Sequence, residues 1–165
     1  MIQLFTELQE KKNVRSNLSA LRASLKEATE EQKAQAIEFV RGHEDLVFGF
    51  LQEEDAKTRK NAALLLGDLA VQNALQPLWK AYTREQTLFV KSAYLEAMKA
   101  LHAEEILSQL KDRLAELEGE PVTEENRKHW EAELRALRAI LIQYEGIDTH
   151  HFCLLYTSPS PRDRS

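Results

Sequence analysis

Apolar residues recur every three or four positions along the chain between Val14 and Tyr144, with polar residues between them. This spacing matches the turn of an α-helix and not the two-residue alternation of a strand. Short breaks separate the apolar stretches, so the pattern predicts a succession of amphipathic helices joined by tight connections. The clearest stretches are 18–25, 36–42, 46–51, 62–69, 90–101, 106–117 and 130–141.

Polar residues ahead of several stretches indicate where helices begin. Residues 29–32 and 83–86 both have the spacing of a capping box, in which a threonine oxygen accepts a first-turn N–H and a glutamine reaches back to the cap. Asp55 stands where an N-cap is expected before the stretch 62–69. The last long helix is predicted to begin near Thr123, where two glutamates follow and suit the positive end of the helix dipole.

The composition favours helices over sheet. Of the 165 residues, 43% are apolar and 30% charged, and only 5 glycines and 4 prolines are present to punctuate a many-stranded fold. The expected fold class is therefore all-α. No apolar run approaches the roughly 20 residues needed to cross a bilayer, and the N-terminus lacks the layout of a signal peptide. We therefore expect a cytoplasmic protein without membrane contact.

The last residues differ in character from the rest of the chain. Residues 153–163 resemble a translated sequencing-library transposase adapter, because codons that spell this stretch follow the adapter DNA letter for letter. We therefore treat 153–165 as a non-native, disordered tail and 147–152 as the start of a lost downstream segment or linker. The chain is then expected to be an N-terminal fragment with one helical domain over 1–146.

Setting the tail aside changes two properties that bear on function. It removes Arg162, Arg164 and Asp163, so the net charge moves from −5 to −6, which argues against a strongly basic nucleic-acid binder. It also removes Cys153, which is the only cysteine. A thiol nucleophile or a metal thiolate is therefore not expected.

The helical pattern recurs in pairs at a constant offset, which we call the repeat register. It relates 46–50 to 78–82 and 58–69 to 90–101, so both helices of a pair recur together. Each pair carries apolar residues on more than one side and can bury them only by stacking against its neighbours. Four aromatic residues at helical spacing are expected in this core: Trp79, Tyr82, Tyr94 and Trp130.

The central pairs resemble the HEAT-repeat family. The residues that carry the resemblance are Asp55, Thr58-Arg59, Ala62-Ala63 and Leu66-Gly67, followed by 73–78. It covers 46–101 and implies a right-handed α-solenoid of about four helical hairpins, of which the first and last are divergent. Thr58, Lys91 and Lys99 depart from the family pattern, in which valine, arginine and glycine are usual. These departures leave the tightness and curvature of the packing open.

No catalytic, cofactor-binding or metal-binding residues emerge from the sequence. It has no glycine-rich phosphate loop and no nucleophile elbow. His43 and His102 fall at predicted helix ends, where a histidine commonly complements the dipole, and His129 falls on a solvated face. His150 and His151 make a poor chelate, because adjacent residues of an extended chain point to opposite sides. We expect no cofactor and a fragment that is not an enzyme.

Basic residues gather on the predicted second helices of the central pairs. Residues 56–70 and 87–101 contain four lysines and an arginine against one aspartate and one glutamate, a net charge of +3. In HEAT-like solenoids these helices line the concave surface, so the lysines are candidate partner-binding residues: Lys57, Lys60, Lys91 and Lys99. A protein partner or acidic segment is expected, with weak, salt-sensitive nucleic-acid contact as the alternative. Arg59 is expected to pair with Asp55 or with a carboxylate of the next repeat.

Two classes of function follow from this pattern. The first is a HEAT-repeat scaffold module that binds other macromolecules, chiefly proteins, and performs no chemistry. The alternative is an N-terminal accessory domain that positions substrate for a larger enzyme, an RNA-modifying methyltransferase being one such parent. A DNA-repair enzyme built wholly of such repeats would need a strongly basic groove, and the acidic balance counts against it. The oligomeric state is left open.

Overall fold

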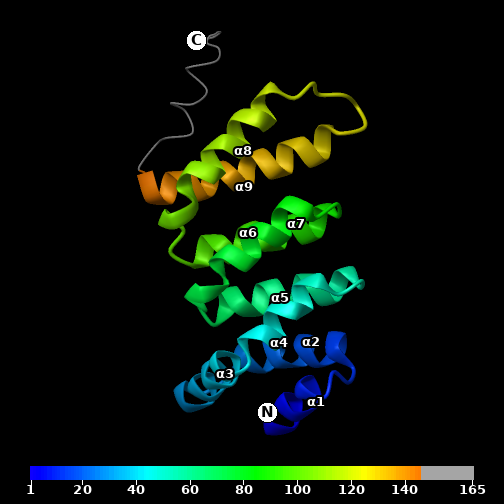
Figure 1. Cartoon of the computed structure of the whole chain (residues 1–165), viewed down its shortest axis with the longest axis vertical. Helices are drawn as coiled ribbons and strands as arrows, with labels where there is room; N and C mark the ends of the chain where they lie inside the picture. Colours follow the sequence, from blue (N-terminus) through cyan, green and yellow to red (C-terminus); the bar gives the residue numbers. More distant parts are fainter. Residues whose placement is uncertain (146–165) are drawn as a thin grey trace. The chain divides into compact units, whose positions relative to one another are not determined.

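The computed structural model describes residues 1–145, with the backbone alone for Glu145 (Figure 1). This part of the chain contains α-helices and short 3₁₀-helices and no strand, so the all-α prediction is confirmed for it. The chain divides into two compact units, of which unit 1 is Met1–His102 and unit 2 begins at Ala103. Within the described residues no helix has the length and apolar character needed to span a membrane. The predicted segments 147–152 and 153–165 lie outside the described residues.

Unit 1 begins with three helices, which are α1 (Ile2–Gln9), α2 (Val14–Leu25) and α3 (Glu30–Gly42). The sequence analysis did not predict α1, although Leu4, Phe5 and Leu8 lie at helical spacing, and Leu8 is its one buried residue. Phe5 of α1 stacks on Phe39 of α3, with ring centroids 4.5 Å apart. α2 packs chiefly against α1 and against the later helix α5 (Ala56–Asp68) rather than against α3.

Unit 1 continues with two helical pairs. Their elements are α4 (Glu44–Gly49), η1 (Phe50–Gln52), α5, η2 (Gln72–Ala74), α6 (Leu75–Arg84) and α7 (Leu88–Ala100). The offset from α5 to α7 is the same at the first and at the last residue, and it equals the repeat register that the sequence pattern predicted. The same offset separates the first residue of η2, Gln72, from the first residue of the 3₁₀-helix η3, Glu104.

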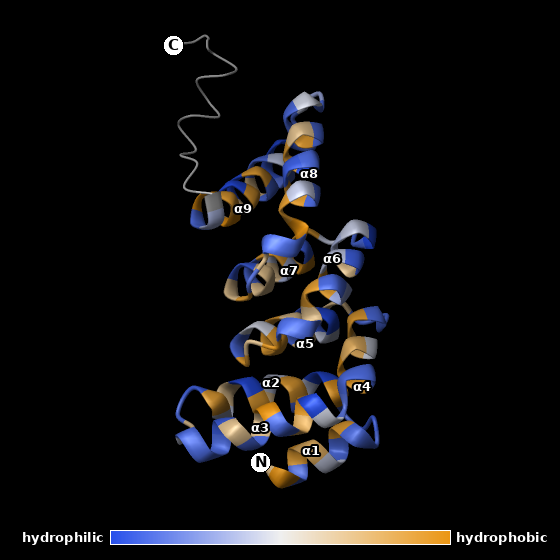
Figure 2. Ribbon diagram, turned by 60° about the vertical axis from the view of Figure 1, so that its left-hand side comes forward, coloured by the Kyte–Doolittle hydropathy of each residue, from blue (hydrophilic) through white to orange (hydrophobic). Residues whose placement is uncertain are grey.

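α5 and α7 lie side by side, and α2 packs against α5 as well (Figure 1). The two backbones approach closely at Gly67, where an added Cβ would lie 2.9 Å from the Cα of Ala97. Only glycine fits this spacing without a shift of one helix. Ala62 and Ala63 are fully buried in the same helix, so small residues line much of its packed side. Figure 2 shows hydrophobic and hydrophilic residues sharing each helix, as expected when one side is buried.

Two predicted helix starts are confirmed. Thr29 Oγ1 accepts the backbone N–H of Gln32 at 3.1 Å while Gln32 Oε1 accepts the N–H of Thr29 at 3.0 Å, which completes the capping box of α3. Asp55 Oδ2 accepts the N–H of Thr58 at 2.9 Å and caps α5. Asp55 also accepts a hydrogen bond from Arg15 of α2 at 3.2 Å, so the cap links two helices.

The capping box predicted at 83–86 is wrong. α6 continues to Arg84, so Thr83 lies inside that helix and its hydroxyl donates to the Lys80 carbonyl at 2.7 Å. α7 takes Thr87 as its N-cap residue, without a side-chain cap. Glu85, the C-cap residue of α6, has extended backbone and forms an ion pair with Arg59 in the turn between α6 and α7.

The described part of unit 2 is a helical hairpin. Its elements are η3 (Glu104–Ile106), α8 (Leu107–Gly119) and α9 (Arg127–Glu145). Buried leucines from both long helices form its core: Leu110, Leu114, Leu117, Leu134, Leu137 and Leu141. α9 begins at Arg127 rather than near Thr123. Ahead of it, Thr123 and Asn126 each accept the other's backbone N–H, at 3.2 and 2.7 Å, which is the reciprocal pattern that also caps α3.

Candidate functional site

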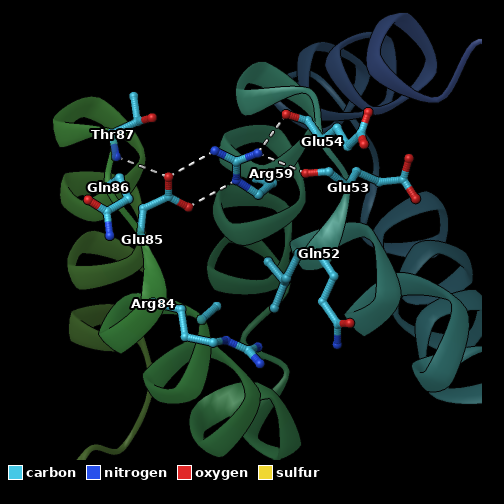
Figure 3. A pocket seen from close by; sticks show the side chains of 10 residues that line it. Gln52, Glu53, Glu54, Arg59, Arg84, Glu85, Gln86 and Thr87 are labelled. Carbon is cyan, nitrogen blue, oxygen red and sulfur yellow. Dashed lines mark hydrogen bonds and ion pairs between the residues drawn. The ribbon is translucent and has the colours of Figure 1, made fainter.

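Arg59 of α5 joins three chain segments at one end of the α5–α7 pair (Figure 3). Its Nε and Nη2 donate to the two carboxylate oxygens of Glu85 at 2.9 and 2.8 Å, a bidentate pair. Its Nη1 donates to the carbonyl oxygens of Glu53 and Glu54, both at 2.8 Å. Of the two partners predicted for Arg59, the carboxylate of the following helical pair is therefore confirmed.

Glu85 receives two further hydrogen bonds. The Tyr94 hydroxyl donates to its Oε1 at 3.1 Å and the Thr87 N–H donates to its Oε2 at 3.2 Å. Burial acts to raise the pKa of Glu85, but the hydrogen bonds from Arg59 and Thr87 outweigh it and hold this pKa below the ordinary value. Burial and the neighbouring Glu85 charge raise the pKa of Tyr94. At neutral pH Glu85 is therefore ionised and Tyr94 is not.

A cavity of about 380 Å³ lies beside this cluster. Figure 3 shows Arg59 and Glu85, which both line it, directed toward each other, with Gln52 and Arg84 nearby. Four of the five N–H donors of the Arg59 guanidinium are already used. The cluster therefore ties the turn before α5 to the turn before α7 and fixes where those helices start.

The structure places the four candidate lysines at separate points of α5 and α7. Lys57 is exposed and Lys60 half-buried, one turn apart near the start of α5. Lys91 holds its Nζ 5.1 Å from the centroid of the Tyr82 ring, a cation–π contact. Lys99 is exposed in the last turn of α7, about 12 Å along the helix axis from Lys91. The four do not form one tight cluster.

Ion pairs alter the charge that the second helices offer. Arg59 is neutralised by Glu85, and Asp68 accepts a hydrogen bond from Arg22 of α2 at 2.9 Å. Apart from Asp68, the one acidic residue of 56–70 and 87–101 is the exposed Glu96, so the four lysines leave these helices with a net positive charge.

Sequence reasoning missed an exposed aromatic residue at the start of α7. Phe89 is 46% exposed in the first turn of α7. It occupies the position in α7 that the exposed Lys57 occupies in α5. The repeat register was therefore the signal that could have found it.

A second concave feature lies between α2, α3 and the end of α5. This cleft has a volume of about 420 Å³. Its lining combines three cations and one carboxylate with four aliphatic side chains, which are Arg22, Lys26, Lys33, Asp68, Leu25, Ile37, Leu69 and Ala70. These residues come from three helices whose packing the periodicity does not predict, so the cleft could not be foreseen.

Histidines and acidic residues form no metal centre in the described part of the chain. Within residues 1–145 no group of three or more His, Cys, Asp or Glu side chains is placed to hold a metal ion. His43 separates α3 from α4, and His102 follows the end of α7, as predicted. His129 is exposed on α9. The pair His150 and His151 lies outside the described residues.

Comparisons with known proteins identify no relative. No family model matches the sequence, no curated protein is significantly similar to it, and no solved structure matches the fold. The HEAT-repeat and solenoid assignments therefore stay predictions. The constant offset between equivalent helix bounds is the structural observation that bears on them.

Proposed function

We propose that this chain is a non-catalytic scaffold module of the HEAT-repeat, α-solenoid type, which binds an acidic segment of a protein partner. The binding surface, here called the α5–α7 face, is the part of these two helices that carries Lys57, Lys60, Lys91, Lys99 and Phe89. The pairing of α5 with α7 is the observation that carries the proposal. Both helices have 13 residues. They are related by the repeat register and pack side by side, which is the arrangement that stacked helical repeats produce.

The packing of this pair supports a binding role because it holds the exposed side chains at fixed spacing. Gly67 brings the two backbones close together, and the bond between Arg59 and Glu85 fixes the turns at the other end of the helices. A surface that is already ordered loses little conformational entropy when a partner binds. The helix positions that carry Lys57 and Phe89 are therefore already fixed before a partner binds.

The charge of the face supports an acidic protein segment as the partner. The lysines Lys57, Lys60, Lys91 and Lys99 outnumber Glu96, although the whole chain has a net charge of −5. Such a local contrast directs an acidic partner to this face. Exposed Phe89 adds an apolar contact that suits a peptide better than a phosphate backbone. So few lysines would give nucleic acid only weak, salt-sensitive binding.

Fluorescence polarisation with a fluorescein-labelled glutamate-rich peptide tests the proposal. The double variant Lys57→Glu, Lys60→Glu should bind the peptide about tenfold more weakly, because each reversed charge removes an attraction and adds a repulsion. Lys91→Glu and Lys99→Glu should each reduce the affinity for the peptide by a smaller factor. The matched control is Lys80→Glu, an exposed lysine on the first helix α6, which should bind as wild type does.

Two results would overturn the proposal. One is equal weakening by Lys80→Glu and by the double variant, since it would show attraction to the chain without a preferred face. The other is tighter binding of a labelled single-stranded RNA than of the peptide, with the same dependence on the lysines.

A further inference from the structure

We infer that the cleft between α2, α3 and α5 is a second docking site, which takes an acidic peptide segment through an aliphatic anchor residue. This inference rests on the proposed function, because it names the sequence class of the partner segment. It also gives that segment a second place of contact in unit 1.

The floor of the cleft fits an aliphatic side chain. Leu25 and Leu69 are buried, at 8% and 6% exposure, and Ile37 is half-buried. The volume of about 420 Å³ falls in the lower part of the range for ligand pockets, about 300–1,000 Å³. An inserted leucine side chain would remove apolar surface from water on both partners.

The cations around the floor select an acidic segment. Arg22 is held by Asp68 at 2.9 Å, and Lys33 lies 3.8 Å from the exposed Glu30. The Lys26 side chain is exposed and forms no hydrogen bond or ion pair with any described residue. Three cations against Asp68 give the lining a net charge of +2. Carboxylates on either side of the anchor would pair with the two lysines, which come from different helices.

The cleft and the proposed α5–α7 face both include residues of α5. Asp68 lies three helical turns after Lys57, so both residues are on the same side of α5, about 16 Å apart. An extended segment of about five residues covers that distance. One acidic segment can therefore place its anchor in the cleft and its flanking carboxylates toward Lys57.

Three labelled peptides test this site by fluorescence polarisation. The first has a central leucine flanked by glutamates, the second replaces the leucine with serine, and the third replaces the glutamates with lysines. The leucine peptide should bind about tenfold more tightly than the serine peptide, because only it buries an anchor. The difference in affinity between the leucine peptide and the lysine-flanked peptide should be larger still.

Protein variants separate the cleft from the α5–α7 face. Lys26→Glu, Lys33→Glu removes the attraction at the cleft, and Ile37→Ser makes its half-buried floor polar. Both should weaken binding of the leucine peptide about tenfold, and Ile37→Ser should bring its affinity to that of the serine peptide. Circular dichroism of each variant checks that the helices are retained. Lys57→Glu, Lys60→Glu is the comparison variant and should leave the preference for leucine over serine unchanged.

The outcomes distinguish the two proposals. Equal affinity for the leucine and serine peptides, with loss confined to Lys57→Glu, Lys60→Glu, overturns the cleft and supports the α5–α7 face. Loss confined to the cleft variants supports the cleft and overturns the α5–α7 face. Equal or tighter binding of the lysine-flanked peptide overturns the charge argument for the cleft, and absence of binding by all three peptides overturns both sites.

Discussion

Both units contain a partly buried arginine–glutamate pair, but the two arginines have different sets of partners. In unit 2, Arg113 of α8 donates to both carboxylate oxygens of Glu133 of α9, at 2.8 and 3.1 Å. Its Nη1 also lies 3.3 Å from carboxylate oxygens of Glu116 and Glu120. In unit 1, Arg59 has one carboxylate partner and completes its bonding with backbone carbonyls.

This difference shows how much each unit depends on one side chain. Arg59 is 16% exposed, and without Glu85 it would keep a partly buried positive charge with only carbonyl oxygens to compensate it. Arg113 would keep two exposed carboxylates if Glu133 were lost. The Arg59 site therefore relies on a single carboxylate, whereas the Arg113 site distributes its pairing over three.

Replacing each glutamate with glutamine should give the largest effect and test this comparison directly. Glu85→Gln should lower the free energy of unfolding by about 3 kcal/mol, the usual cost of leaving one member of a buried pair uncompensated. Glu133→Gln should cost about 1 kcal/mol, because Glu116 and Glu120 still neutralise Arg113. Urea unfolding followed by circular dichroism measures both. Equal losses in the two variants would show that the additional carboxylates contribute nothing.

The close approach of α5 and α7 gives the next largest effect. Gly67→Ala places a Cβ 2.9 Å from the backbone of Ala97, so one helix must move, and we expect a net loss of about 1–2 kcal/mol despite the better helix propensity of alanine. Gly49→Ala is the matched control, since nothing lies within 4 Å of its Cβ. That control should stabilise unit 1 by about 0.5–1 kcal/mol. Parallel changes in the two variants would contradict the close packing.

The features that could be predicted from sequence are those set by neighbouring residues. The caps at Thr29 and Asp55 depend on residues three positions away, and the repeat register depends on repetition of a local pattern. The start of α7 could not be predicted in this way. The spacing of residues 83–86 suits a helix start, but Glu85 lies in a turn, where it accepts hydrogen bonds from Arg59, a residue 26 positions earlier in the chain.

The candidate sites show the same limit. The lysines of α5 and α7 could be proposed from charge and register, yet the aromatic contact of Lys91 with Tyr82 joins two helices and was not foreseen. The α2–α3–α5 cleft was missed because α2 packs against α5 rather than pairing with α3. Such packing follows from the complete set of buried contacts and has no signature in one helix alone.

The free energy of unfolding should depend on pH through two groups of the Arg59 cluster, Glu85 and Tyr94. The folded pKa of Glu85 lies below its ordinary value of about 4.3, so its contribution is present above that pH and is lost as the pH falls through the folded pKa. The folded pKa of Tyr94 is raised, so its contribution is present below about pH 10 and is lost as the pH rises toward the folded pKa. Urea unfolding across the pH range measures both limbs.

Single variants show which residue causes the acid loss of stability and which causes the alkaline loss. Tyr94→Phe should remove the alkaline loss and cost about 1 kcal/mol at neutral pH, the value of one hydrogen bond to Glu85. Glu85→Gln should remove most of the acid loss. An alkaline loss that persists unchanged in Tyr94→Phe would assign it to other residues and would contradict the role of Tyr94.

The smallest effects concern the ends of α5 and α8, where glycine and alanine occupy each other's favoured positions. α5 ends in a Schellman motif, in which Ala70 has φ 52° and the N–H of Val71 donates to the Leu66 carbonyl at 3.0 Å. This left-handed position costs alanine about 1 kcal/mol, so Ala70→Gly should stabilise unit 1 by about 0.5–1 kcal/mol. Gly119 ends α8 without left-handed backbone and with open space around its Cβ, so Gly119→Ala should stabilise unit 2 by a similar amount. Thermal unfolding measures both, and a loss in Ala70→Gly would mean that its methyl group contributes more to the α2–α3–α5 cleft than the backbone strain costs.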